Sequence, residues 1–230
     1  MKHIVFIIGS LRKDSFNRQL AMVAESLLKD RFVISYLDFE NIPYFNQDLE
    51  SSIVNSQQST DNSQCSKSAP ESKSSFHRSE DGELEAGCRC FADSHVEAYG
   101  RMSLSIIRQQ ILDCDGIWVF TPEYNRSYPG LLKNLFDWLS RPMDISNPTN
   151  ATAVQGKKIT VSGAGGNNKT ASCREKLNEL LRFIKMDVMT ETQTGIALGK
   201  EAWTNGEFKL TDEQLSELKT QAEKFAEFVQ

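Results

Sequence analysis

Residues 9–17, Gly-Ser-Leu-Arg-Lys-Asp-Ser-Phe-Asn, carry side chains suited to holding a phosphate group. Ser10 and Ser15 supply hydroxyls, and Arg12 supplies a guanidinium that can bind a phosphate through two parallel hydrogen bonds. A short apolar run precedes this segment, and apolar residues at helical spacing follow it. We therefore expect Ser15 to cap a helix whose N-terminal N–H groups attract an anion. The alternative is an ordinary capped turn with a surface arginine.

A second candidate segment, residues 121–130, reads Thr-Pro-Glu-Tyr-Asn-Arg-Ser-Tyr-Pro-Gly and follows the apolar run 116–120. Its prolines and glycine stiffen the chain, so its backbone N–H and C=O groups are expected to form a fixed hydrogen-bonding edge for a planar ligand. The alternative is a turn whose tyrosines only pack against their neighbours.

A third candidate segment is rich in glycine and follows a strand that we expect to end at Ser162. Gly163, Gly165 and Gly166 would let the backbone approach a ligand closely and would leave N–H groups pointing into a cleft. Glycine-rich turns after strands are common, so this segment supports a binding site only in combination with the other two segments.

Apolar segments that alternate with helical patterns predict an α/β fold. The expected strands are residues 3–8, 32–37, 116–120, 158–162 and 186–189. The expected helices are residues 17–28, 102–112, 131–139, 174–185 and a last helix capped by Thr211 with Gln214 in a capping box. This order indicates a doubly wound, five-stranded parallel sheet of flavodoxin-like order 2-1-3-4-5, which places the three candidate segments around one crevice. Such a crevice suits a phosphate tail joined to a flat heterocycle.

Length and composition favour a single domain over residues 1–230. The 230 residues carry a net charge of −5, which argues against a nucleic-acid or membrane-surface role. The chain enters a strand at once, without a signal peptide, and no apolar run approaches the ~18 residues that a membrane span requires. Five cysteines without a framework spacing suit free thiols in a reducing compartment, so we expect a cytoplasmic protein.

The segment at about 51–95 interrupts this domain. It is rich in Ser, Gln and Asn and nearly devoid of large apolar residues, which predicts a disordered insertion that hangs free. Its possible zinc ligands do not have a zinc-site spacing, and we expect no metal there. These ligands are Cys65, His77, Cys88, Cys90 and His95.

Three motifs together resemble the NAD(P)H-dependent FMN reductase family, with bacterial quinone and chromate reductases and azoreductases as the nearest branches. The motifs are residues 9–17, residues 121–125 with Ser127, Pro129, Gly130, Lys133 and Asn134, and residues 162–166. The resemblance covers about 1–50 and 98–230. It implies FMN as cofactor, NADPH or NADH as co-substrate, and a homodimer or homotetramer.

The resemblance also implies three groups of residues around FMN. The residues at its phosphate would be Ser10, Arg12, Ser15 and Asn17. Those along the isoalloxazine would be Pro122, Glu123, Tyr124 and Asn125, with Ser162, Gly163 and Gly165 on its other side. Tyr124 and Arg126 would stand at the rim, either against the pyridine nucleotide or in a subunit contact.

The activity implied is hydride transfer from NAD(P)H through flavin N5 to a quinone or a similar acceptor, such as an azo compound, chromate or free flavin. Binding and stacking would carry the catalysis, so no catalytic side chain is expected. Two departures from the family are Asp14, a carboxylate in a loop that should meet a dianion, and the long insertion. Two other functions stay open: a flavodoxin-like electron carrier that ignores NAD(P)H, and a non-catalytic module whose Ser-rich segment recruits a partner.

Overall fold

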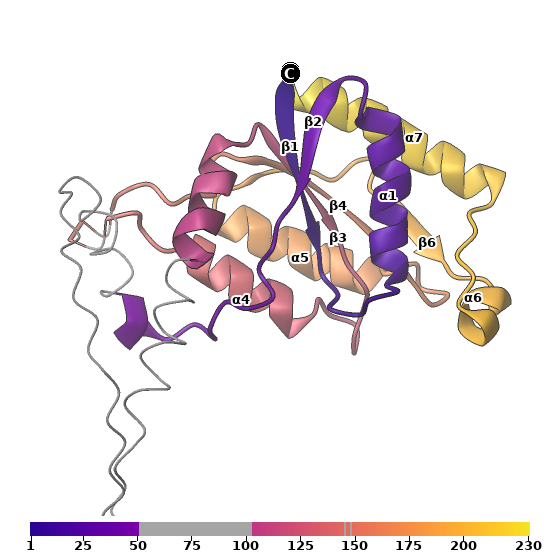
Figure 1. Cartoon of the computed structure of the whole chain (residues 1–230), viewed down its shortest axis with the longest axis horizontal. Helices are drawn as coiled ribbons and strands as arrows, with labels where there is room; N and C mark the ends of the chain where they lie inside the picture. The colour runs from indigo at the N-terminus through magenta and orange to yellow at the C-terminus, as the bar shows by residue number, and fades with distance from the viewer. Residues whose placement is uncertain (51–102, 145, 148) are drawn as a thin grey trace, which may run out of the picture.

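The computed structural model describes residues 1–50, 103–144, 146–147 and 149–230, and Figure 1 shows how they are arranged. The described strands form one sheet in which neighbouring strands run parallel. Their order across the sheet is β2 (Phe32–Tyr36), β1 (Lys2–Ile8), β3 (Gly116–Phe120), β4 (Lys158–Gly165) and β5 (Asp187–Met189). The predicted doubly wound, flavodoxin-like order 2-1-3-4-5 is confirmed.

A further short strand, β6 (Gly195–Ala197), was not predicted from the sequence. It pairs in parallel with Gly163 to Gly165, beyond the part of β4 that pairs with β5. The expectation that the fourth strand ends at Ser162 is therefore wrong. Gly163 and Gly165, which the sequence predicts in a loop, belong to β4, because β6 gives this part of the strand a hydrogen-bonding partner.

Helices connect the strands and cover the sheet. They are α1 (Phe16–Leu28), residues 103–113, α4 (Gly130–Leu139), α5 (Ala171–Phe183), α6 (Lys200–Asn205) and α7 (Asp212–Val229). Both predicted caps are confirmed: the Ser15 hydroxyl accepts from the Asn17 N–H, and Thr211 with Gln214 forms the capping box of α7. Helix α5 begins ahead of the predicted start at Arg174, and α6 was not predicted.

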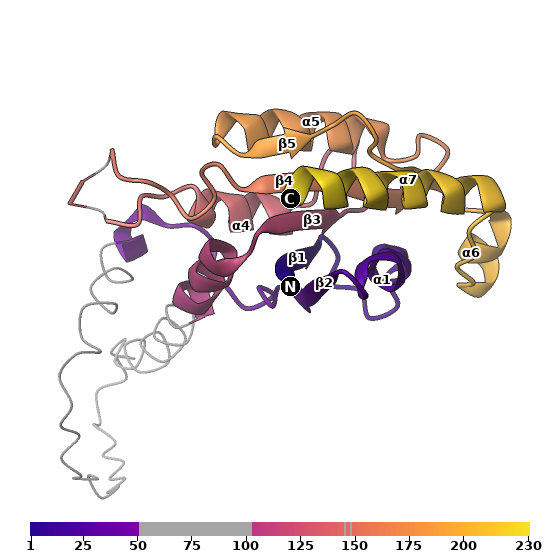
Figure 2. The same ribbon diagram turned by 90° about the horizontal axis from the view of Figure 1, so that it is seen from above.

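Successive residues of each central strand pack against opposite layers of helices, as the period of a strand requires. In β1, Val5 and Ile7 join the core beneath α4, α5 and residues 103–113, whereas Phe6 and Ile8 join the core beneath α1 and α7. Figure 2 shows α4 and α5 on one side of the strands and α1 on the other. The apolar run that opens the chain is thus buried on both faces, and the loop that follows it emerges at the edge of the sheet.

The predicted insertion at about 51–95 falls outside the described residues, and so do the possible zinc ligands Cys65, His77, Cys88, Cys90 and His95. Within the described part of the chain, no helix has both the length and the apolar character needed to span a bilayer.

Candidate functional site at the carboxyl edge of the sheet

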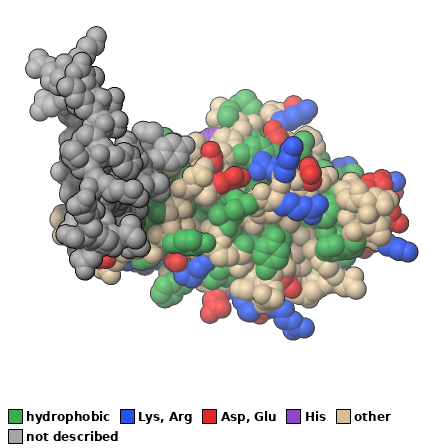
Figure 3. All heavy atoms as spheres, turned by 60° about the horizontal axis from the view of Figure 1, so that its bottom comes forward, with side chains coloured by type: hydrophobic (Ala, Val, Ile, Leu, Met, Phe, Trp, Pro, Cys, Tyr) green, Lys and Arg blue, Asp and Glu red, His purple; other side chains and the backbone are tan. Residues whose placement is uncertain are grey.

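Backbone hydrogen bonds between neighbouring strands bring the three candidate segments to one edge. The Gly9 N–H donates to the Phe120 carbonyl at 2.8 Å, and the Thr121 N–H donates to the Ser162 carbonyl at 2.9 Å. The edge lies at the bottom of Figure 1, and Figure 3 turns it forward to show hydrophobic side chains set among charges of both signs. The structure therefore places the ends of β1, β3 and β4 side by side.

The loop of residues 9–15 leaves several hydrogen-bond donors without a protein acceptor. The buried Ser10 and Ser15 hydroxyls accept from the N–H groups of Arg12 (3.4 Å) and Asn17 (3.2 Å), and neither donates its own hydrogen to a described residue. Four backbone N–H groups of this loop also lack an acceptor within the described chain. They belong to Ser10, Leu11, Lys13 and Asp14. Together with the α1 N-terminus, these donors can hold an anion.

Arg12 and Asp14 are both exposed in this loop. The Arg12 guanidinium carbon lies 4.9 Å from the ring centroid of Phe16 and makes no ion pair with a described residue. Asp14 also faces solvent, so its carboxylate does not have to meet an anion bound at the N–H groups.

The Asn17 side-chain amide is hydrogen-bonded to the protein backbone at both ends. Its Oδ1 accepts from the Ala164 N–H at 2.8 Å, and its Nδ2 donates to the Ala164 carbonyl at 3.1 Å. The side chain is buried, and both ends of its amide fasten the first turn of α1 to β4. Asn17 therefore positions the phosphate-suited loop against the glycine segment.

The loop after β3 contains a two-residue hairpin turn. Tyr124 and Ser127 exchange backbone hydrogen bonds of 3.0 and 2.9 Å, and the two residues between them, Asn125 and Arg126, have φ angles of 50° and 58°. This left-handed backbone is well tolerated by Asn and uncommon for Arg. The N–H groups of Glu123, Asn125 and Arg126 have no acceptor among the described residues, which leaves the hydrogen-bonding edge expected for a planar ligand.

Glu123 ties this loop to α5. Its carboxylate accepts from Asn168 Nδ2 at 3.0 Å and from the Cys173 N–H at 2.9 Å. Thr170 precedes α5 with a φ of 56° and provides no side-chain cap, so Glu123 takes the place of the capping residue. Partial burial favours the neutral acid, but the hydrogen bonds from Asn168 and Cys173 and the charge of Arg126 outweigh it and lower the pKa of Glu123.

Pro122 is half-buried at the start of the same loop. Its carbonyl accepts from the Thr121 hydroxyl at 2.9 Å and lies 3.4 Å from the Cys173 sulfur, which is fully buried. Burial raises the pKa of the Cys173 thiol to about 11, so this group stays protonated near neutral pH.

At the end of β4 the polar groups are used internally. The buried Ser162 hydroxyl accepts from Trp118 Nε1 at 3.0 Å and donates to Gln221 Oε1 at 2.7 Å. The Gly163 N–H donates to the Thr194 carbonyl at 3.2 Å, so the expectation that this N–H points into the crevice is wrong. At Gly165, a Cβ would lie 2.9 Å from a methyl group of Thr170. These glycines allow close packing against the protein itself.

Gln221, on the last helix, is a structural residue that the sequence analysis does not single out. It is fully buried, and its amide oxygen accepts from Ser162 Oγ and the Thr194 N–H, both at 2.7 Å. Its nitrogen donates to Thr160 Oγ1 at 2.9 Å and to the Val161 carbonyl at 3.1 Å. It lies three residues after Leu218, on the buried face of α7, and a polar residue at such a position is the sequence signal that could have identified it.

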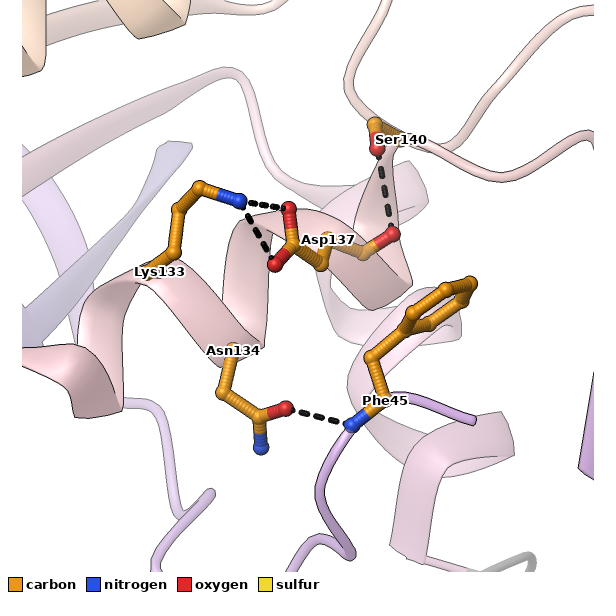
Figure 4. Close-up of polar contacts among 5 residues, drawn as sticks. All are labelled: Phe45, Lys133, Asn134, Asp137 and Ser140. Atoms are coloured by element: carbon orange, nitrogen blue, oxygen red, sulfur yellow. Dashed lines mark hydrogen bonds and ion pairs between the residues drawn. The ribbon is translucent and has the colours of Figure 1, made fainter. Parts of the chain in front are cut away.

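The last residues of the second motif position α4 (Figure 4). Asn134 Oδ1 accepts from the Phe45 N–H at 2.7 Å, and Asn134 Nδ2 donates to the Pro43 carbonyl at 3.0 Å. Lys133 and Asp137 form an exposed ion pair of 2.6 Å one turn apart. The two Asn134 hydrogen bonds hold α4 against the segment that follows β2, and the 121–129 loop leads directly into that helix.

Comparison with known proteins gives the family. Residues 2–201 match the family described as NADPH-dependent FMN reductase, and the chain belongs to this family of oxidoreductases, which depends on FMN and NAD(P)H. The chain is 33% identical over 141 residues to a quinone reductase of Escherichia coli (strain K12), a match that covers 60% of this chain and 71% of that protein.

It is also 33% identical over 139 residues to a 2-hydroxy-1,4-benzoquinone reductase of Burkholderia sp. That match covers 60% of this chain and only 50% of the relative. Among solved structures, FerB from Paracoccus denitrificans, a flavoenzyme NAD(P)H:(acceptor) oxidoreductase, aligns over 100% of this chain and 97% of its own with a TM-score of 0.67 and 24% identity. This structural similarity supports the assignment of the flavodoxin-like fold alone.

Proposed function

We propose that FMN binds at the carboxyl edge of the sheet and that the protein transfers hydride from NADPH or NADH to quinones or to similar acceptors, namely azo compounds, chromate or free flavin. The observation that carries this proposal is the set of unused donors in residues 9–15. Two buried hydroxyls and a series of backbone N–H groups that have no acceptor among the described residues precede α1, in the same loop as Arg12.

The donor set fits a phosphate monoester. Ser10, Ser15 and the free N–H groups would hold its oxygens, and Arg12 would add a charge-assisted pair of hydrogen bonds. Asn17 would keep this loop in register with β4 through its two bonds to Ala164.

The 121–125 segment fits the flat ring system. The free N–H groups of Glu123 and Asn125 would orient it by donating to its acceptor atoms, and Pro122 would pack against it. When bound, FMN supplies hydride acceptance and donation at its N5 atom, so we assign no acid or base to the protein. The other side of the ring system would be bordered by Ser162, Gly163 and Gly165. They would contact it through their shape alone, because the Ser162 hydroxyl and the Gly163 N–H already form hydrogen bonds within the protein.

The rim of this site suits exchange of two different small molecules. The Tyr124 side chain is 56% exposed and Arg126 is exposed as well, so both can contact a pyridine nucleotide or an electron acceptor that enters in turn. Relatives named quinone reductase and 2-hydroxy-1,4-benzoquinone reductase make quinones the first class to test.

The test is a steady-state assay of the full chain loaded with FMN. NADPH and NADH are compared as donors, and 1,4-benzoquinone, an azo dye, chromate and free FMN are compared as acceptors. The proposal predicts nucleotide oxidation that depends on the acceptor and is fastest with the quinone. Protein that retains FMN but oxidises neither nucleotide with any acceptor would contradict it and favour an electron carrier.

A further inference from the structure

An aromatic cluster supports the arginine of the proposed phosphate site. The Arg12 guanidinium lies over the ring of Phe16, the first residue of α1, which is only 7% exposed. The Phe16 ring is stacked on Phe208, with 6.1 Å between centroids and 22° between planes. Trp203 meets the same ring edge-on at 6.4 Å and 72°.

Both outer aromatics come from the segment around α6, which follows β6. Trp203 lies on α6, and Gly206 ends this helix with a φ of 73° that turns the chain toward Phe208. The Trp203 side chain remains 62% exposed, and Phe16 is its aromatic neighbour within the described chain. The family match ends at residue 201, so both aromatics lie beyond the matched region.

We propose that Trp203 and Phe208 are positioning residues for Arg12: they fix the ring of Phe16, and this ring fixes the guanidinium where a flavin phosphate would bind. This inference rests on the proposed function, because it takes the phosphate of FMN as the ligand of Arg12.

The geometry lets Arg12 contact the ring and the phosphate at once. A guanidinium is planar, and its five N–H donors point outward in that plane. A guanidinium stacked on an aromatic ring keeps the donors at its edge free for phosphate oxygens. A long exposed side chain otherwise loses considerable rotamer freedom on binding, and a side chain already held over a ring loses less.

The test compares FMN with riboflavin, which has the same ring system but no phosphate. Affinities for both are measured by flavin fluorescence titration for the wild type and for Phe208→Leu and Trp203→Leu, which keep apolar volume but remove the aromatic ring. We expect FMN affinity to fall in each variant by up to about two- to fivefold, with riboflavin affinity unchanged; the upper limit is the full value of an exposed cation–π contact, because the Phe16 ring itself stays in place. The conservative Phe208→Tyr should restore FMN affinity.

Two comparisons make this result specific. In an Arg12→Ala background, the Phe208→Leu substitution should no longer change FMN affinity, because there is no guanidinium to position. The matched control is Phe228→Leu, which removes another ring beneath a cation, since Lys158 Nζ lies 5.6 Å from the Phe228 centroid at the opposite end of β4. It should leave both affinities unchanged.

Parallel losses of FMN and riboflavin affinity, or a Phe208→Leu effect that persists without Arg12, would show that the cluster only stabilises the fold and would overturn this inference alone. Failure of the wild type to bind either flavin would contradict the proposed function, and the positioning role would fall with it.

Discussion

The loop after β1 and the end of β4 lie at the same edge of the sheet but use their polar groups in opposite ways. In residues 9–15, the Ser10 and Ser15 hydroxyls and a series of N–H groups have no acceptor within the described part of the chain. At the end of β4, Ser162, Gly163 and Ala164 are bonded to α7, to the residue before β6 and to α1. The first region therefore keeps donors available for the proposed ligand, whereas the second uses its polar groups within the fold, although the sequence predicts a ligand loop at both.

The largest expected effect is a loss of stability at Gly163. A Cβ placed there would meet the Thr170 hydroxyl and would lie 2.5 Å from the Thr121 carbonyl oxygen, which is backbone and cannot swing away. We expect Gly163→Ala to lower the free energy of unfolding by about 3 kcal/mol, the top of the usual range for overpacking. Chemical denaturation of the flavin-free protein measures this.

Gly166→Ala is the matched control for that substitution. A Cβ at Gly166 has no neighbour within 4 Å, so its unfolding free energy should stay close to that of the wild type. Equal stability of the two alanine variants would contradict the structural role assigned to the end of β4.

At Arg12 we expect the opposite pattern, a loss of FMN affinity without a comparable loss of stability. This residue is exposed and forms no ion pair with a described residue. Arg12→Ala should weaken FMN binding about 10- to 100-fold, the loss expected for hydrogen bonds to a charged group. It should lower the unfolding free energy of the flavin-free protein by no more than about 0.5–1 kcal/mol, because only its contact with the Phe16 ring is lost. Lys13→Ala, an exposed neighbour, serves as control and should change FMN affinity much less. Similar FMN affinities of the two variants would argue against Arg12 as the phosphate ligand.

A smaller, pH-dependent effect is expected at Glu123. Its hydrogen bonds lower its pKa in the folded protein, so its stabilisation is complete above the unfolded pKa of about 4.3 and is lost as the pH falls through the lower folded value. Glu123→Gln should cost about 0.3–1 kcal/mol near pH 7, the worth of an anion at a helix N-terminus. Denaturation from pH 7 to pH 3 should show this difference shrink, and a difference that grows in acid would refute the capping role.

The smallest effect is expected at Asp14. Because its side chain is exposed, Asp14→Ala should change FMN affinity by less than about threefold at physiological salt, where screening is strong. When the titration is repeated at low salt, Asp14→Ala should bind FMN slightly more tightly than the wild type does. A large gain in affinity at physiological salt would mean that the carboxylate faces the bound phosphate.

Local signals and long apolar runs were enough to predict much of the fold. The Ser15 cap and the Thr211 capping box each depend on residues three positions apart or fewer, and the buried strands follow from continuous apolar segments. Strand β6 was missed because two of its three residues are Gly195 and Ala197, which are poor strand formers, whereas the equally short β5 contains Val188. The end of β4 was misjudged because its hydrogen-bonding partner lies some thirty residues further along the chain.

Side-chain roles that join distant segments were likewise beyond local patterns. Asn17 bonds Ala164, and Glu123 caps a helix that begins at Ala171. In both cases the residue type suited a ligand as well as it suited the protein partner, and only the tertiary arrangement distinguishes the two. Residues 9–15 are the opposite case. The sequence predicts that their donors face a ligand, and in the structure these donors have no acceptor among the described residues.

The central claim is that this edge of the sheet holds FMN in a state that accepts hydride. The most direct measurement is the visible absorption spectrum of the full chain reconstituted with FMN, titrated without oxygen first with NADPH or NADH and then with a quinone. We predict protein-bound flavin bands that bleach in one two-electron step and return when the quinone is added. A chain that binds no FMN, or whose bound FMN is unchanged by both nucleotides, would contradict the account.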